Sequence, residues 1–456
     1  MEYAYEERIG NPDLFVGRKK ELAFFLKWIE NVKEKKSKSM ALLARRKTGK
    51  TAIMERLFNI IFDKNDGVIP FYYEVKDEKM WVVDFCQDFF LTFIYQYMAF
   101  KTRKVEYLQP LEEINFSKVK KIASEEGLDY LNTLIGSVEY AVKHGKIDLL
   151  WQLTREAPKN IASRQKEFIV QMIDEFQFLN GRIYRDKATK NLADSMVGGY
   201  LSTAESKIAP MLVTGSWVGW LMNMLIMLLP SRFIMKPLEN MGEDESIEMV
   251  FKYAGFFDVP VTEETAFLIA KLAEGNPFYI SSILRSQFPD KDLTTLEGLA
   301  RTLEFETLND RGEIKSTWMT YVNSAFNQVN NKNSKNIVLY LCKHRDREVT
   351  RKELFEKLQL DMTDGELEFK LKALIKADII LQGATNYDYH GVHDNIFDKV
   401  FRGVYQKEIE NFEPAQIKKE YQDAFKNLQK QYQKLQGKFN YHKGYYAEYA
   451  IVDQFP

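Results

Sequence analysis

Ala44-Arg-Arg-Lys-Thr-Gly-Lys-Thr51 is the stretch that decides the fold of this chain. It directly follows the apolar run Met40–Leu43 and directly precedes a helical pattern that starts at Ala52. A strand, a loop ending in Gly-Lys-Thr and a helix form the arrangement in which backbone N–H groups and a helix N-terminus hold phosphates. Lys50 is expected to reach the β and γ oxygens as a point charge, and Thr51 to place its hydroxyl on Mg²⁺.

One position departs from the usual phosphate-loop pattern. Ala44 stands where the first glycine is expected. Because alanine disfavours a positive φ, the start of the loop is expected to be altered. Nucleotide binding without turnover is therefore kept as one interpretation.

A second motif lies about 120 residues further on, where an apolar strand-like run ends in two acids. Phe168–Ile173 is followed by Asp174 and Glu175. Carboxylates at the end of a buried strand are costly unless something there uses their charge. In a phosphate-loop protein, Mg²⁺ uses this charge. The first acid holds the metal, and the second polarises the attacking water. An ordinary strand running into an acidic turn is the alternative, and the order of the two motifs favours an ATP site.

Several motifs resemble, in one order, those of archaeal-type P-loop ATPases of the STAND/AAA+ group. The matching segments are Phe15-Val-Gly-Arg-Lys-Lys-Glu-Leu22 (the box upstream of the loop), Arg45-Arg-Lys47 (its basic middle), Ile173-Asp-Glu-Phe-Gln177 (Walker B), Met211–Ser216 (the sensor-1 strand), Pro230-Ser-Arg232 (a downstream arginine) and Gly275-Asn-Pro277 (the lid motif). The resemblance runs from about residue 10 to about residue 400.

The resemblance implies a role for each matching residue. The nucleotide would contact Phe15, Val16, Arg18, Arg45, Arg46, Lys47, Thr48, Gly49, Lys50, Thr51, Ala52 and Pro277. Mg²⁺ would lie on Thr51 and Asp174, and the catalytic residues would be Asp174, Glu175, Ser216 and Arg232. Ser216, with Thr214 as the alternative, would orient the water. Arg232 would act either as an arginine finger or as a sensor in its own chain.

The chain is long enough for two to four domains, and an α/β fold is expected for the first. The predicted domains are a P-loop parallel-sheet core over 1–240 with a helical insertion at 101–165, a helical lid and connector over 241–330, a winged helix over 331–410, a C-terminal helix over 411–440 and a tail over 441–456. Gly444 and Glu448 in the tail resemble the opening of a nuclease-like domain, but its metal-binding core is missing.

The predicted winged helix offers duplex DNA as a partner, through its third helix. That helix carries Lys370, Lys372 and Lys376, but acidic residues stand beside them and a DNA reader needs unopposed cations. Two functions therefore remain open. One is a nucleotide-driven switch that changes its assembly or its protein partner, and the other is a DNA-associated ATPase.

Composition limits the remaining classes. The chain has 64 basic and 65 acidic residues, so a net charge of −1 gives no global attraction to nucleic acid or to acidic lipid. Its two cysteines, Cys86 and Cys342, lack metal-site spacing and suit a reducing compartment. The uncharged stretch Ile208–Pro230 is expected to be a buried strand and a helix with methionine core filler, not a membrane span. An acidic N-terminus without an apolar core agrees with a cytoplasmic location.

Overall fold

The computed structural model describes residues 3–109, 113–193, 195–216, 218–329, 333–392, 394–409, 423 and 425–437. The chain divides after Glu239 into two compact units, residues 1–239 and 240–456. The predicted tail at 441–456, with Gly444 and Glu448, lies outside the described residues, as does most of 411–424.

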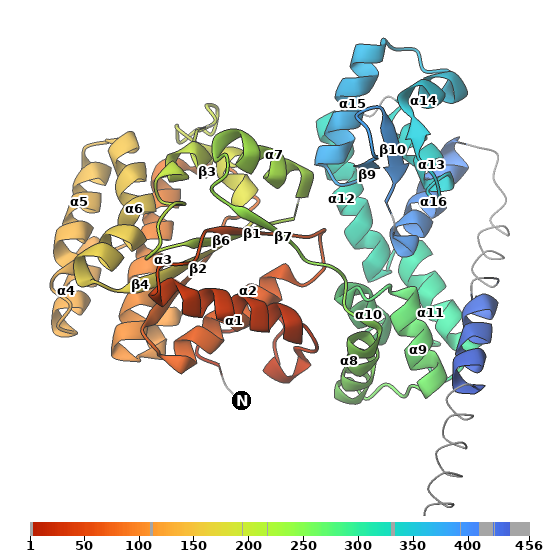
Figure 1. Cartoon of the computed structure of the whole chain (residues 1–456), viewed down its shortest axis with the longest axis horizontal. Coiled ribbons are helices and arrows are strands. Elements are labelled where there is room, and N and C mark those ends of the chain that lie inside the picture. Colours follow the sequence, from red (N-terminus) through yellow and green to blue (C-terminus); the bar gives the residue numbers. More distant parts are fainter. Residues whose placement is uncertain are drawn as a thin grey trace, which may run out of the picture. The chain divides into compact units, whose positions relative to one another are not determined.

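A five-stranded sheet, in the order β2-β4-β6-β1-β7, forms the centre of the first unit (Figure 1). All four pairings between neighbours are parallel. Apart from β7 the strands are almost fully buried, as expected for a parallel sheet covered by helices on both faces. The strands are β1 Met40–Leu43, β2 Val68–Glu74, β4 Phe168–Asp174, β6 Met211–Gly215 and β7 Ile234–Pro237.

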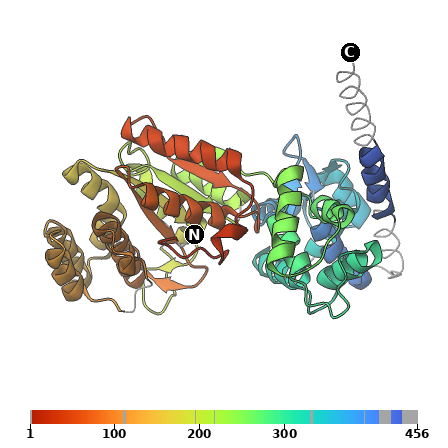
Figure 2. The same cartoon turned by 90° about the horizontal axis from the view of Figure 1, so that it is seen from below.

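Helices α1 and α2 pack against one face of this sheet, and α3 covers the other (Figures 1 and 2). The alternation of side chains along β2 shows the division. Phe71 and Tyr73 contact aromatic rings of α3, whereas the Tyr72 ring lies against Tyr5 of the N-terminal segment. The helices of the first unit are α1 Lys19–Lys33, α2 Lys50–Lys64, α3 Val82–Thr102, α4 Phe116–Glu125, α5 Leu131–Lys143, α6 Ile147–Gln165 and α7 Val218–Leu228.

The segment predicted as an insertion is helical and stacks outward from α3, with α6 against α3, then α5, then α4 (Figure 1). Short elements complete the unit. A two-stranded parallel sheet pairs β3 Met80–Trp81 with β5 Ile183–Tyr184. The 3-10 turns are η1 Pro12–Leu14, η2 Val105–Leu108, η3 Phe176–Asn180 and η4 Val197–Leu201.

A side chain of α3 closes the free edge of β2. Gln96, only 5% exposed, accepts from the Tyr72 backbone N–H at 2.8 Å and donates to the Tyr72 carbonyl at 2.9 Å. One amide therefore takes the place of a neighbouring strand and satisfies both backbone groups of a buried edge residue.

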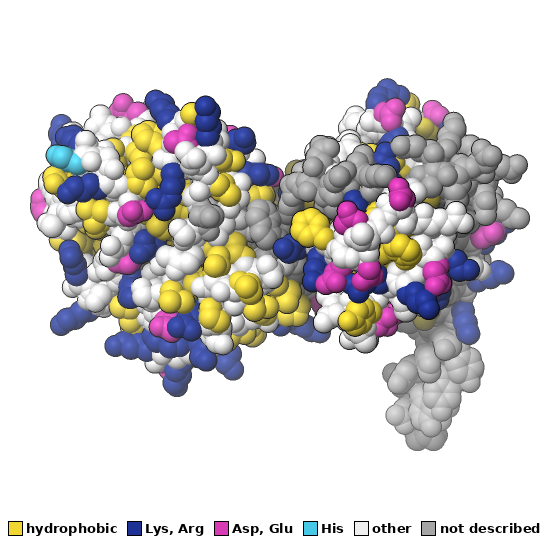
Figure 3. Space-filling view, turned by 90° about the horizontal axis from the view of Figure 1, so that it is seen from above, with side chains coloured by type: hydrophobic (Ala, Val, Ile, Leu, Met, Phe, Trp, Pro, Cys, Tyr) yellow, Lys and Arg dark blue, Asp and Glu magenta, His cyan; other side chains and the backbone are white. Residues whose placement is uncertain are grey.

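The uncharged stretch forms β6 and α7, as predicted, but the expected burial of its methionines is only partly correct. Met224 is buried, whereas Met227 is 72% exposed, beside exposed Ile226 and Leu228 on α7. Figure 3 shows hydrophobic side chains gathered on one face of the first unit. Among the residues that the structure describes, no helix is long and apolar enough to cross a bilayer.

The second unit is mainly helical. A buried chain of hydrogen bonds joins its helices, because the Trp318 indole donates to the Tyr279 hydroxyl at 2.9 Å and that hydroxyl donates to Asp394 at 2.8 Å. The predicted lid and the predicted winged helix therefore share one compact unit. Its helices are α8 Glu243–Phe256, α9 Glu263–Leu272, α10 Pro277–Leu284, α11 Leu296–Leu308, α12 Glu313–Val329, α13 Ser334–Lys343, α14 Arg351–Leu358, α15 Asp364–Lys376 and α16 Asn395–Ile409.

Within this unit, α13, α14 and α15 are followed by a β-hairpin, in the order that the sequence predicts. The antiparallel sheet has the order β8-β10-β9, with β8 Val349–Thr350, β9 Ile380–Gln382 and β10 Asp388–Gly391. Residues 425–437 are helical, and the Tyr432 ring lies 5.3 Å from that of Phe267 on α9.

We predict that Gln96→Leu destabilises the first unit. Leucine fits the volume but leaves the buried N–H and C=O of Tyr72 without partners, a loss of about 2–4 kcal/mol. Calorimetric unfolding of the full chain checks this, with Gln87→Leu on the same helix as the control. Equal transition temperatures for the two variants would contradict the role given to Gln96.

Candidate functional site

The loop between β1 and α2 has a backbone shaped for phosphate. Lys47 and Gly49 have left-handed φ values of 67° and 91°. Ala44 is buried and is not among the residues with positive φ, so its backbone is in a conformation that alanine readily adopts; an effect of Ala44 on the loop stays a prediction. The left-handed positions of the loop lie three and five residues later.

The first turn of α2 is open toward this loop. No side chain caps its N-terminus at Gly49, so its first N–H groups are directed at the loop, where an anion is favoured. The buried Lys50 ammonium donates to the carbonyls of Ala44 and Arg45, at 2.8 Å each. The Thr48 hydroxyl donates to the Arg45 carbonyl at 2.9 Å, which closes the loop on itself.

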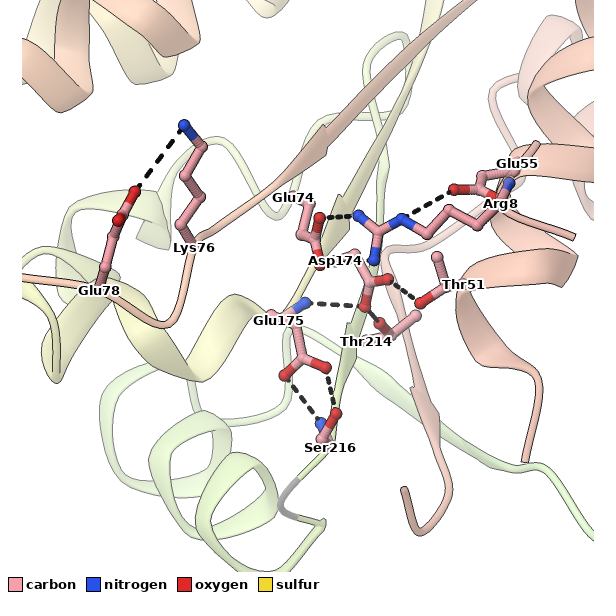
Figure 4. A network of polar contacts seen from close by, with 10 residues as sticks. All are labelled: Arg8, Thr51, Glu55, Glu74, Lys76, Glu78, Asp174, Glu175, Thr214 and Ser216. Atoms are coloured by element: carbon pink, nitrogen blue, oxygen red, sulfur yellow. Dashed lines mark hydrogen bonds and ion pairs between the residues drawn. The ribbon is translucent and has the colours of Figure 1, made fainter. Parts of the chain in front are cut away.

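Two oxygen ligands meet where α2 faces the end of β4. The Thr51 hydroxyl donates to Asp174 Oδ2 at 2.5 Å. Asp174 is fully buried, and its Oδ1 accepts from the Thr214 hydroxyl and, at 2.8 Å, from the Glu175 N–H (Figure 4). The structure thus brings together the two residues predicted to hold the metal.

Glu175 follows β4 with a left-handed φ of 53°, which turns its side chain away from that of Asp174. It accepts from the hydroxyl of Ser216 and, at 3.2 Å, from the Ser216 N–H. The sequence left Thr214 and Ser216 as alternatives. In the structure each donates a hydrogen bond to one of the two acids, Thr214 to Asp174 and Ser216 to Glu175. A Cβ at Gly215, between them, would displace the end of the Gln177 side chain.

Residues of the upstream box, Phe15–Leu22, contact the loop and α2. The buried guanidinium of Arg18 donates to the Thr48 carbonyl at 2.9 Å and to the Glu239 carbonyl at 2.6 Å. The Phe15 ring lies 4.3 Å from the Arg56 guanidinium of α2, and Val16 is buried. These contacts tie the box to the loop and its helix, and adenine contacts by Phe15, Val16 and Arg18 stay predictions.

The other predicted loop positions are half-buried or exposed. Lys47 is exposed, Arg45 and Ala52 are half-buried, and Arg46 Nη2 lies 3.9 Å from Asp77 Oδ2. Pro277 is the first residue of α10 in the second unit, after the Asn276 side chain that caps this helix. Its contact with nucleotide stays a prediction.

Arg232 lies at the opposite edge of the sheet from the loop. It precedes β7, whose register pairs Ile234 with Met40 and Pro237 with Leu43, so β7 alone separates it from the loop by about 10 Å. Its guanidinium donates to the Pro230 carbonyl at 2.8 Å and lies 3.0 Å from Glu205. The structure does not bring Arg232 to the loop of its own chain, and its role as a sensor or as an arginine finger stays a prediction.

Three charged residues near Thr51 and Asp174 were not found by sequence reasoning: Arg8, Glu55 and Glu74. Glu55 lies one turn after Thr51 on α2 and is 1% exposed, and Glu74 ends β2 beside Asp174 in the sheet register. Arg8 bridges the two acids (Figure 4). The only sequence signal for these residues is Glu55, an acidic residue among the buried positions of α2.

Burial raises the pKa of Glu55 from 4.5 to about 7. Repulsion from the Asp174 and Glu7 carboxylates adds to the increase, while the backbone N–H and the charge of Arg8 oppose it. A buried carboxyl with this pKa is partly protonated at neutral pH.

The residues present fit Mg²⁺ with a triphosphate. Mg²⁺ in proteins is held by one or two carboxylates together with substrate phosphates, and hydroxyl and carboxylate oxygens suit it. Thr51 and Asp174 supply such oxygens beside the uncapped end of α2. Within the described part of the chain, no three acidic, histidine or cysteine side chains converge on a metal position of their own.

No protein-family model matches the chain, and no curated protein matches its sequence. Among solved structures, it is similar to the Walker-type ATPase paby2304 of Pyrococcus abyssi, with a TM-score of 0.53 and 14% identity over 87% of this chain and 98% of that one. Weaker likenesses are to the ORC2 protein of Aeropyrum pernix in its ADPNP–ADP complexes (TM-score 0.45, 11% identity, 86% and 94% covered) and to the RuvB Holliday junction branch migration motor of Thermotoga maritima (TM-score 0.35, 14% identity, 88% and 98% covered). The chain thus has the predicted α/β fold with a central parallel sheet, which it shares with that Walker-type ATPase, and a mainly helical second part.

We predict that Glu55 makes stability depend on pH. Between pH 4.5 and 7 the unfolded chain loses this proton while the folded chain keeps it, so stability is present at low pH and is lost as pH rises to about 7. The loss amounts to about 3 kcal/mol. Glu55→Gln removes it, so the variant should gain on the wild type between pH 5 and pH 8, measured by urea denaturation. A constant difference between the two proteins would contradict this assignment.

Proposed function

We propose that the chain binds ATP with Mg²⁺ and hydrolyses it at this site. The hydrogen bond between Thr51 and Asp174 carries the proposal, because it joins the uncapped phosphate-binding helix to a fully buried carboxylate. Buried carboxylates are retained where their charge is used. The fold shared with a Walker-type ATPase supports the same conclusion.

Each residue then has a role that its position permits. Lys50 exchanges the loop carbonyls for oxygens of the terminal phosphates, and the N–H groups of the loop and of α2 hold the rest of the polyphosphate. Thr51 and Asp174 would hold Mg²⁺, which would supply charge neutralisation for the phosphates. Glu175 orients the water that attacks the terminal phosphorus, and the bond to the bridging oxygen breaks to leave ADP and phosphate. Ser216 fixes the orientation of Glu175, and Thr214 that of Asp174.

We predict that Glu175→Gln keeps Mg·ATP binding but reduces turnover at least about 100-fold, because it removes the carboxylate that orients water. Lys50→Ala should weaken binding itself. Calorimetric titration and phosphate release check the pair, with the exposed Glu113→Gln as the control. Unchanged turnover in Glu175→Gln would refute the role of Glu175, and equal binding in Lys50→Ala would refute that of Lys50.

We further propose that the hydrolysis cycle works as a switch of assembly or protein partner in the cytoplasm, and not on duplex DNA. The third helix of the predicted winged helix offers few cations for phosphates. Lys370 is buried and donates to the Ser334 hydroxyl at 3.2 Å, which corrects its predicted place on a DNA-binding surface. Lys372 is paired with Glu368 at 2.5 Å, and Phe369 is 74% exposed on the same helix. An exposed ring beside neutralised charges suits a protein partner better than DNA.

We predict that the full chain forms an assembly of larger mass in solution when Mg·ATP is added. Arg232 precedes β7, whereas the loop of its own chain follows β1 at the other end of these paired strands, and this favours action on a neighbouring copy. If Arg232 acts on a neighbouring copy, turnover per chain increases with protein concentration. Arg232→Ala should remove this increase and leave nucleotide affinity unchanged. Sedimentation and phosphate release at several concentrations check both points, with Arg301→Ala as the control. One mass in all conditions would contradict the assembly switch.

A further inference from the structure

The N-terminal strap, residues 3–10, is fixed across α2. Asn59 of α2 accepts from the Tyr5 N–H and donates to the Tyr5 carbonyl, both at 2.9 Å. Glu7 forms a buried bidentate ion pair with Arg56 of α2, at 2.7 and 2.8 Å. The strap is thereby held in register with the helix that begins at the phosphate loop.

This register places Arg8 beside the part of the candidate site that contains Thr51 and Asp174, the predicted metal ligands. Its Nη1 donates to Glu74 Oε1 at 3.0 Å, its Nη2 donates to Glu74 Oε2, and its Nε lies 3.5 Å from Glu55 Oε1 (Figure 4). Its backbone N–H donates to Glu55 Oε2 at 2.9 Å. The Arg8 side chain is 56% exposed, so the guanidinium reaches both acids from the open side.

Both acids stand close to residues of the site. Glu74 is the register partner of Asp174 on the neighbouring strand, and Glu55 lies one helical turn from Thr51. A triphosphate placed at this edge would meet the Glu74 carboxylate and the partly ionised Glu55, beyond the acids that hold the metal or orient water. Negative charges near a bound anion cost affinity, and the cost grows with each negative charge on the ligand.

We propose that Arg8 determines the preference for ATP over ADP by neutralising Glu55 and Glu74 where the terminal phosphate arrives. The inference rests on the proposed nucleotide site. Arg8 is a positioning residue in this account, since it acts on the ligand through the field of the two acids. ADP lacks the terminal phosphate and is therefore less sensitive to the same charges.

The experiment measures dissociation constants of ADPNP and of ADP, each with Mg²⁺, for the full chain. Arg8→Gln should weaken ADPNP about tenfold and ADP by no more than about twofold. Arg8→Lys, which keeps the charge, should stay close to the wild type. Arg301→Gln is the matched control, because Arg301 is a half-exposed arginine paired with Asp290 at 2.8 Å in the second unit.

The double variant Arg8→Gln/Glu74→Gln separates charge from structure. Removing one carboxylate should restore most of the ADPNP affinity, whereas a purely structural role of Arg8 would leave it low. Equal weakening of ADPNP and ADP, or no recovery in the double variant, would overturn the inference. Should Arg8→Gln fail to fold, Glu74→Gln alone must bind ADPNP at least about threefold more tightly with ADP unchanged. Absence of any nucleotide binding by the wild type would remove the proposed function itself.

Discussion

The hydrogen bond from the Thr51 hydroxyl to the Asp174 carboxylate joins the first turn of α2 to the end of β4. Asp174 is fully buried, so its charge has to be met by neighbouring groups, and the Thr214 hydroxyl and the Glu175 N–H provide the rest. These partners come from the helix after β1 and from the ends of β4 and β6. The order of the sheet, the loop and the position of Glu175 are therefore coupled through one carboxylate.

The features that the sequence predicted well are those that a short contiguous stretch of residues encodes. Apolar runs predicted β1, β4 and β6, and the run from Ala44 to Thr51 predicted the loop between β1 and α2. Arg8, Glu55 and Glu74 lie far apart in the sequence, and only the sheet register and the strap bring them together. No local pattern marks such a cluster, because charged residues at these positions are equally typical of solvated surfaces.

Where the structure departs from expectation, the difference concerns how side chains are oriented. Met227 was expected in the core but is exposed on α7, and Lys370, on the helix predicted to face DNA, is buried. Helix periodicity alone does not fix which face another element covers. The direction of β7 places Arg232 away from the loop of its own chain, and that direction is a property of the sheet and not of the motif.

A structure of the full chain with Mg²⁺ and the ATP analogue ADPNP would locate the nucleotide and its metal. We expect a metal at about 2.0–2.1 Å from the Thr51 hydroxyl oxygen, bound to Asp174 either directly or through a water molecule. Lys50 would then contact the terminal phosphates in place of the loop carbonyls. Nucleotide bound elsewhere, or a loop left without ligand at saturating Mg·ADPNP, would refute the proposed site.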